Sequence, residues 1–171
     1  MFAPYIQQQE KCTLLKIIGS ILILASCYLI GNNLSRNAEI TMKITESLIS
    51  FTSYIGTSIK TLRIPLKNIY SNFENEDLTE IGFISELKER GLSKAVEKLE
   101  GILTQEGLNA MNYLNSNLGG IDINDQYNLC LYVENKLKVE LENIKKKYKE
   151  KRRMYRLLPI LCGISAIILL V

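Results

Sequence analysis

The sequence contains no histidine among its 171 residues. Histidine is the most frequent general base, the usual base of a catalytic triad and the most frequent metal ligand in proteins. No segment matches the phosphate-binding pattern GxxxxGK[ST] either. We therefore expect no catalytic residues, no cofactor and no metal site, and we expect that the chain is not an enzyme. A nucleophile activated by lysine, or a pair of carboxylates, would need no histidine, but no residue pattern points to either.

Cysteine is scarce and irregularly placed. The four cysteines are Cys12, Cys27, Cys130 and Cys162. No two of them form a CxxC pair and three lie in or beside apolar segments, so the pattern indicates neither a disulfide framework nor a zinc site. The acidic stretch 74–80 lacks the spacing of an EF-hand loop, which favours a solvated turn over a cation site.

Charge is unevenly distributed, although the net charge is only +3. Residues 32–144 carry 11 basic and 16 acidic side chains, a net charge of −5, whereas residues 145–156 carry 8 basic side chains and 1 acidic one, a net charge of +7. A nucleic-acid-binding domain usually carries its positive charge on the folded body, so this distribution argues against nucleic acid as a partner. We call residues 145–156 the basic collar; its positive residues are Lys145, Lys146, Lys147, Lys149, Lys151, Arg152, Arg153 and Arg156.

Two apolar segments flank the charged middle of the chain. The first covers residues 14–31, after a short N-terminal segment of residues 1–13, and the second covers residues 157–171. As a helix the second segment would be about 22 Å long, which is shorter than a hydrocarbon core of roughly 30 Å. Flanking residues or local thinning of the bilayer would make up the difference. We expect both segments to be transmembrane helices; a buried C-terminal core helix is the alternative for the second.

The basic collar decides the expected orientation, because lysine and arginine next to a membrane segment remain on the cytoplasmic side. Lys11 and Lys16 precede the end of the first segment and Arg36 and Lys43 follow it, so the first segment shows no clear bias. Eight positive residues directly precede the second segment, and the segment itself contains none. We therefore expect residues 32–156 to face the cytoplasm, with the collar bound to membrane lipids of the anionic leaflet.

Residues Leu24–Cys27 allow a second interpretation of the first segment. The sequence LASC matches the cleavage box of a bacterial lipoprotein. Cleavage there would leave Cys27 acylated and would export the rest of the chain. The apolar run continues beyond Cys27 through Ile30, and export would put the collar on the wrong side of the membrane, so we favour the uncleaved chain.

Residues 32–156 predict an all-α fold, since apolar residues recur every three or four positions and alternating strand-like runs are absent. We expect a bundle of about five or six helices, with residues 74–80 as an acidic turn and with Thr79 and Ser93 as N-caps. The helices expected before the last one cover residues 35–61, 65–73, 79–91, 93–103 and 105–118. The apolar stripe of the first of these consists of Ile40, Ile44, Leu48, Phe51 and Ile55.

The last helix of the bundle is the clearest, and it leads directly into the collar and the C-terminal segment. Asp122 or Asn124 is the expected N-cap. Its stripe, interrupted by one glutamate, consists of Cys130, Glu134, Leu137, Leu141, Ile144 and Tyr148. The stripe extends over about three heptads, which suits a coiled coil or a bundle helix that faces a core, and we favour the bundle helix.

Several motifs, in this order along the chain, resemble those of one known family. The opening apolar segment resembles the first membrane helix of that family, and Pro65 and Leu66 resemble its proline-leucine helix break. Gly119 and Asp122 lie in LGGID, which is similar to its leucine-glycine-x-x-aspartate loop, and the end of the chain resembles its closing signature. The chain therefore resembles stage III sporulation protein AB of endospore-forming bacteria. It departs from the family pattern at Leu158-Pro159, where the family tends to have leucine-glycine.

The resemblance implies a function that the residues alone do not indicate. It implies a sporulation protein in the mother-cell membrane around the forespore, where it would serve as a scaffold of a secretion-like channel. The implied partners are a secretion-type ATPase, stage III sporulation protein AA, and the other proteins of the same complex; a homo-oligomer is also open. The implied fold is similar to the cytoplasmic domain of the type II secretion platform protein. The alternatives are a membrane-anchored sensor that binds a small ligand and a membrane-bound hydrolase in which Glu134 participates.

Overall fold

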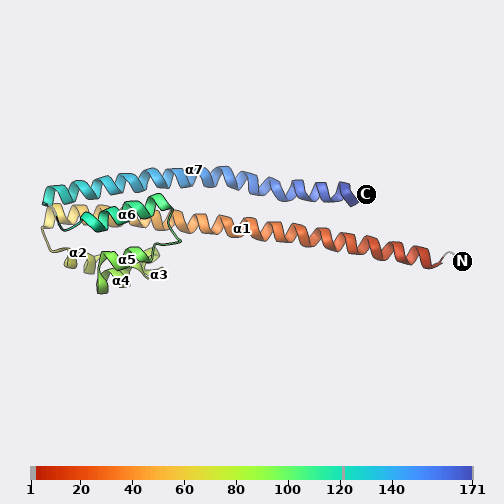
Figure 1. The fold of residues 1–171 in the computed structure, drawn as a ribbon, viewed down its shortest axis with the longest axis horizontal. Coiled ribbons are helices and arrows are strands. Elements are labelled where there is room, and N and C mark those ends of the chain that lie inside the picture. Colours follow the sequence, from red (N-terminus) through yellow and green to blue (C-terminus); the bar gives the residue numbers. More distant parts are fainter. Residues whose placement is uncertain (1–2, 121, 171) are drawn as a thin grey trace. The chain divides into compact units, whose positions relative to one another are not determined.

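The computed structural model describes the backbone of residues 3–120 and 122–170, and most side chains between residues 36 and 151. Over these residues the chain forms helices and no strands, which confirms the all-α fold class (Figure 1). The helices are α1 (Ala3–Leu62), α2 (Leu66–Asn72), α3 (Glu76–Glu80), α4 (Phe83–Arg90), α5 (Leu92–Glu97), α6 (Gln105–Asn117) and α7 (Ile123–Leu170). In the described backbone the expected first membrane segment and first bundle helix are therefore one continuous helix, and so are the last bundle helix and the second segment.

The chain divides into two compact units. One contains residues 1–36 and 147–171, and the other contains residues 37–146. The expected membrane segments 14–31 and 157–171 belong to the first unit, and most of their side chains lie outside the described residues. Among the residues that the structure does describe, no helix offers a stretch that is both long enough and apolar enough to cross a bilayer. The membrane segments thus stay a prediction.

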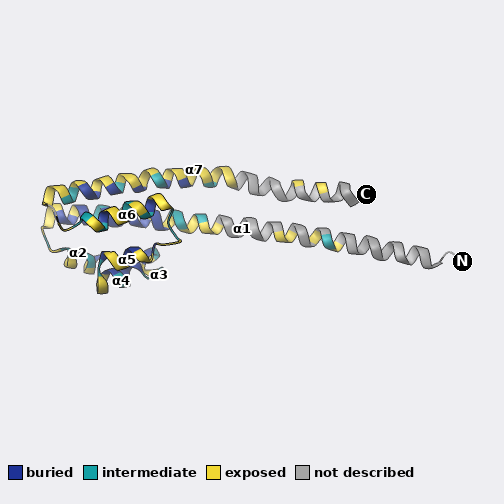
Figure 2. Cartoon of the chain, in the orientation of Figure 1, coloured by how far each residue is buried: buried dark blue, intermediate teal, exposed yellow. Residues whose placement is uncertain are grey.

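In the second unit, α1 supplies one wall of the core. Ile44, Leu48, Phe51 and Ile55 are buried, as the stripe predicts, whereas Ile40 is 40% exposed. Ile40 lies three residues inside the boundary of this unit. Figure 2 shows buried residues of α1 in the part of the helix that lies beside the shorter helices.

An aromatic cluster holds the short helices against α1. The ring of Phe51 is fully buried and lies 5.0 Å from the ring of Phe73 and 5.3 Å from the ring of Phe83, between centroids. Tyr70 lies 6.5 Å from Phe51 on a third side. Aromatic pairs at these separations are stabilising beyond their buried area, so Phe51 links α1 to α2, to α4 and to the segment that follows α2.

Helix α7 packs closely against the other side of α1. A Cβ atom placed on Gly56 would lie 2.9 Å from Cβ of Cys130, a separation that real side chains do not adopt, so the backbones approach as closely as glycine allows. The predicted stripe is confirmed at Cys130, Leu137, Leu141 and Ile144, all of which are buried. Glu134 is half-buried and forms an ion pair with Lys138 one turn later, which explains how a carboxylate is tolerated beside the stripe.

The prediction of the short helices was wrong in two places. Residues 76–80 form α3 rather than a turn, because the side chain of Asn75 accepts a hydrogen bond from the backbone N–H of Leu78 and caps this helix. Thr79 therefore lies inside α3, and α4 follows Gly82 at φ 78°. Ser93 is not an N-cap either, since α5 begins at Leu92 directly after Gly91. These extra breaks raise the number of helices in the described chain to seven.

Candidate functional site: the basic collar and the loop motifs

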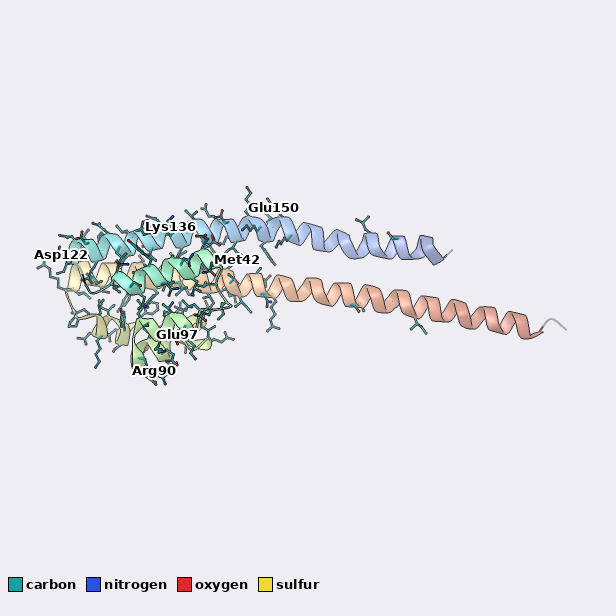
Figure 3. All side chains as sticks on the ribbon, viewed as in Figure 1. Met42, Arg90, Glu97, Asp122, Lys136 and Glu150 are labelled. Carbon is teal, nitrogen blue, oxygen red and sulfur yellow. The ribbon has the colours of Figure 1, made fainter. Side chains whose placement is uncertain are left out.

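The described part of the basic collar is a ring of exposed lysines on α7. Lys145, Lys146, Lys147, Lys149 and Lys151 are all exposed. Successive residues of a helix are rotated by about 100°, so five lysines within seven positions surround most of the helix. Glu150 interrupts them and is exposed as well (Figure 3). The side chains of Arg152, Arg153 and Arg156 lie outside the described residues.

One collar lysine is already paired within the second unit. The Nζ atom of Lys145 lies 2.6 Å from Oε1 of Glu46 on α1, so the start of the collar is joined to the first helix. Both side chains are half-exposed, and an ion pair of this kind contributes less than about 1 kcal/mol. None of the other four lysines forms an ion pair with another described side chain, which leaves them available to bind anions.

The four motif positions lie at the loops that precede α2 and α7. Pro65 precedes α2, and its carbonyl oxygen accepts hydrogen bonds from the N–H groups of Asn68 and Ile69. The carboxylate of Asp122 accepts a hydrogen bond from the N–H of Asn124 at 3.3 Å, and this confirms Asp122 as the residue that caps α7.

Two of the motif positions come together in the structure. Gly119 has φ +92°, and a Cβ atom placed on it would lie 3.3 Å from Cδ1 of Leu66. Leu66 is itself half-buried against the core. The proline-leucine break and the glycine loop therefore form one contact between the start of α2 and the segment that follows α6, although 53 positions separate Leu66 and Gly119 in the sequence.

Replacement of Gly119 by alanine is expected to destabilise the fold by about 1–3 kcal/mol, because the left-handed conformation disfavours a side chain and Leu66 lies in the way. Gly120 is the matched control: a Cβ atom placed on it would have nothing within 4 Å, and its φ falls outside the left-handed region. Gly120→Ala should change the free energy of unfolding by less than about 0.5 kcal/mol. Urea unfolding of both variants, followed by circular dichroism, makes the comparison, and equal effects would contradict the proposed role of the Gly119–Leu66 contact.

Two ionisable side chains in the second unit, Cys130 and Tyr70, have raised pKa values. Burial, with a further contribution from Glu134, raises the pKa of the Cys130 thiol to about 12. Burial, together with Cys130, likewise raises the pKa of Tyr70 to about 12. Because the thiolate is the nucleophile and the metal-binding form of cysteine, Cys130 is poorly suited to either role near neutral pH.

A surface depression of about 590 Å³ lies over α3 and α4. It is open to solvent, and its lining consists largely of polar and charged residues: Glu74, Asn75, Glu76, Thr79, Glu80, Ile84 and Lys88. Pockets for small ligands are usually enclosed and mostly apolar, so this depression gives no support to a sensor. Within the residues that the structure describes, no cluster of three potential metal ligands occurs.

Sequence reasoning missed Glu46 as the partner of the collar. No local signal identifies it, because Glu46 and Lys145 are 99 residues apart in the sequence.

The chain matches the family model described as stage III sporulation protein AB over residues 16–171. No match is found among curated proteins, and none among solved structures. The matched range contains the basic collar and all four motif positions, and it extends over all but the first 15 residues. On this evidence the chain belongs to the stage III sporulation protein AB family.

Proposed function

We propose that this sporulation protein is a non-catalytic scaffold of a secretion-like channel, anchored in the mother-cell membrane around the forespore by residues 14–31 and 157–171. The helical bundle would face the cytoplasm and would couple an ATPase to the membrane. The expected likeness to the type II secretion platform protein is part of this proposal. The observation that carries it is the ring of exposed lysines at the end of the bundle, directly before an apolar segment.

The exposed collar suits a membrane surface in two respects. Four of its lysines have no described anionic partner within the chain, so anionic headgroups can neutralise them. Each basic residue near an anionic leaflet contributes about 1 kcal/mol of attraction. Described apolar side chains in the adjoining segments, Ile18, Ile21 and Leu161, are more than half exposed, which suits contact with lipid.

The short helices offer a surface for the proposed ATPase partner, stage III sporulation protein AA. Their exposed acidic side chains are Glu74, Glu76, Glu80, Glu89, Glu97 and Glu100. Residues 32–144 carry a net charge of −5, so a basic face on the partner would be attracted and oriented by this surface. Removal of these charges should weaken the contact most strongly at low ionic strength.

Labelling in intact cells tests the orientation. Ser93 is exposed on α5, and Ser93→Cys in a chain whose four native cysteines are replaced provides a reactive thiol on the bundle. A maleimide that cannot cross membranes should react with it only after the cells are permeabilised. Reaction in unbroken cells would contradict a cytoplasmic bundle.

A pull-down at low salt tests the partner. The full chain in detergent should retain the ATPase, and the double variant Glu89→Lys, Glu97→Lys should retain less of it. Lys88→Gln with Lys94→Gln, which alters the neighbouring basic positions instead, is the matched control and should retain at least as much. No retention by the unchanged chain at low salt would count against the ATPase as a direct partner.

A further inference from the structure

The outer face of α7 carries an uncharged stripe. Residues 126–133 include no charged side chain, in a chain of which 23% is charged. We define the neutral stripe as the five exposed residues that recur along this face at helical spacing: Asn128, Leu131, Tyr132, Asn135 and Val139. Leu131, Tyr132 and Val139 are 38%, 51% and 60% exposed, which is unusual for large apolar side chains on the same face of one helix.

Helix α6 widens the neutral stripe. Tyr113 of α6 is 50% exposed, and its ring meets the ring of Tyr132 edge to face with 5.7 Å between centroids. Glu106 is the one charged residue of α6, and it lies in the first turn. Exposed tyrosine and asparagine with few charges are typical of protein–protein contacts, because both side chains donate and accept hydrogen bonds.

We propose that the neutral stripe binds the same stripe on a second copy of the chain, with the two α7 helices parallel. The parallel arrangement rests on the proposed function, since two copies anchored in one membrane must enter it with their α7 helices in the same direction. A parallel pair related by a twofold axis places every residue of the stripe opposite its own counterpart.

The absence of charge explains why this stripe suits self-association. In a parallel pair any charged residue on the axis faces an identical charge, and such juxtaposition is strongly unfavourable. The five stripe residues avoid this penalty, whereas the bundle as a whole, with −5 over residues 32–144, repels its copy. An asparagine amide can also hydrogen-bond to an identical amide across the axis, as Asn135 would.

The flanks of the stripe are also compatible with a parallel pair. In a parallel two-helix contact, flanking residues five positions apart meet across the interface. Lys138 of one copy would then face Asn143 of the other, and Lys136 would face Leu131. In the described chain Nζ of Lys136, labelled in Figure 3, lies 5.6 Å from the centroid of the Tyr132 ring, a cation–π contact within one copy. No like charges meet at these flanks.

The pairing ends after Val139, which sets its strength. Glu142 is the next residue on this face, and Lys146 follows it one turn later. Asp125 lies on the same face, three positions before Asn128. Each of these residues would oppose an identical charge. The contact is therefore limited to about three turns of α7 and to Tyr113 of α6. We expect weak association in dilute detergent and stronger association in membranes, where confinement raises the effective concentration.

A charge-exchange experiment identifies the occupant. Two copies of the full chain with different tags are co-expressed and cross-linked in the membrane before solubilisation, and their co-purification is then measured. Asn135→Lys in both copies, or Asn135→Glu in both, should reduce co-purification by about tenfold or more. Asn135→Lys in one copy with Asn135→Glu in the other should restore it, because the opposite charges then face each other. Ser93→Lys in both copies is the control on another exposed helix and should have no effect.

The outcomes decide the proposal. Undiminished co-purification of the two lysine variants, failure of the mixed pair to recover, or no co-purification of the unchanged chain would each overturn self-association through the stripe. If the substitutions at Asn135 weakened binding to another protein of the complex but left co-purification of the two copies unchanged, the stripe would bind that other protein. Self-association through the stripe would then be overturned.

Disulfide cross-linking tests the parallel direction. In a chain without native cysteines, Asn128→Cys and Val139→Cys should each cross-link to the same variant of a second copy. A mixture of the two variants should give little cross-linking between them, because the positions lie about 16 Å apart along the helix. A dominant mixed product would show antiparallel helices and overturn the proposed arrangement. Maleimide labelling of Ser93→Cys reports on the membrane orientation independently, so a failure of the proposed function and a failure of the pairing give different results.

Discussion

Replacement of Phe51 by alanine is expected to lower the free energy of unfolding by about 3–5 kcal/mol, the largest effect of any single substitution that we predict. The ring is fully buried and contacts three aromatic residues from the short helices, so its removal leaves a cavity that these helices cannot all close. The loss should be visible as a lower midpoint of urea unfolding by circular dichroism. Hydrogen exchange should be accelerated most in α2 and α4.

Two further variants give this prediction its control. Phe51→Leu retains most of the buried volume and should cost clearly less than the alanine variant. Ile40→Ala removes an apolar side chain from the same helix at a position that is 40% exposed, and it should cost about 1 kcal/mol or less. Similar losses at positions 40 and 51 would mean that the aromatic cluster is not the main attachment of the short helices to α1.

Neutralising the basic collar is expected to change the orientation of the whole bundle. The residues before and after the first apolar segment carry nearly balanced positive charge, so the eight positive residues before the second segment should decide which side retains the bundle. With all eight replaced by glutamine, we expect the thiol of Ser93→Cys to become reactive in intact cells in roughly half of the molecules, as in a protein without orientation bias.

The matched control removes the same kind of charge from the bundle itself. Lys60, Lys67, Lys88, Arg90 and Lys94 are exposed and lie far from both apolar segments in sequence. Their replacement by glutamine should leave the bundle inaccessible, because charges distant from a membrane segment have little influence on its orientation. If the collar variant is as inaccessible as the unchanged chain, the collar does not determine topology.

The parts of the fold that could be predicted are those with local causes. The spacing of Ile44, Leu48, Phe51 and Ile55 identified the buried face of α1, and Gly91 marked the end of α4. Capping residues were misleading where two candidates lie close together in sequence, because Asn75 rather than Thr79 caps the helix in the acidic stretch. Two polar residues four positions apart are equivalent in sequence, and the packing of Leu78 into the core distinguishes them.

Contacts between distant residues could not be predicted. The collar is evident from its composition, but its ion pair with Glu46 and the contact of Leu66 with Gly119 depend on how α1, α2 and α7 come together. The neutral stripe was also missed, because the apolar periodicity of α7 marks its buried face and not the opposite one.

The close approach at Gly56 has a mechanical consequence. Only a hydrogen atom fits opposite Cβ of Cys130, so a shift of α1 by one turn would bring the side chain of Thr52 or Lys60 into a space that admits neither. The two long helices of the bundle are thereby prevented from sliding past each other unless they first separate. Within residues 37–146, a displacement of α1 along its axis would therefore be transmitted to α7 where Gly56 meets Cys130.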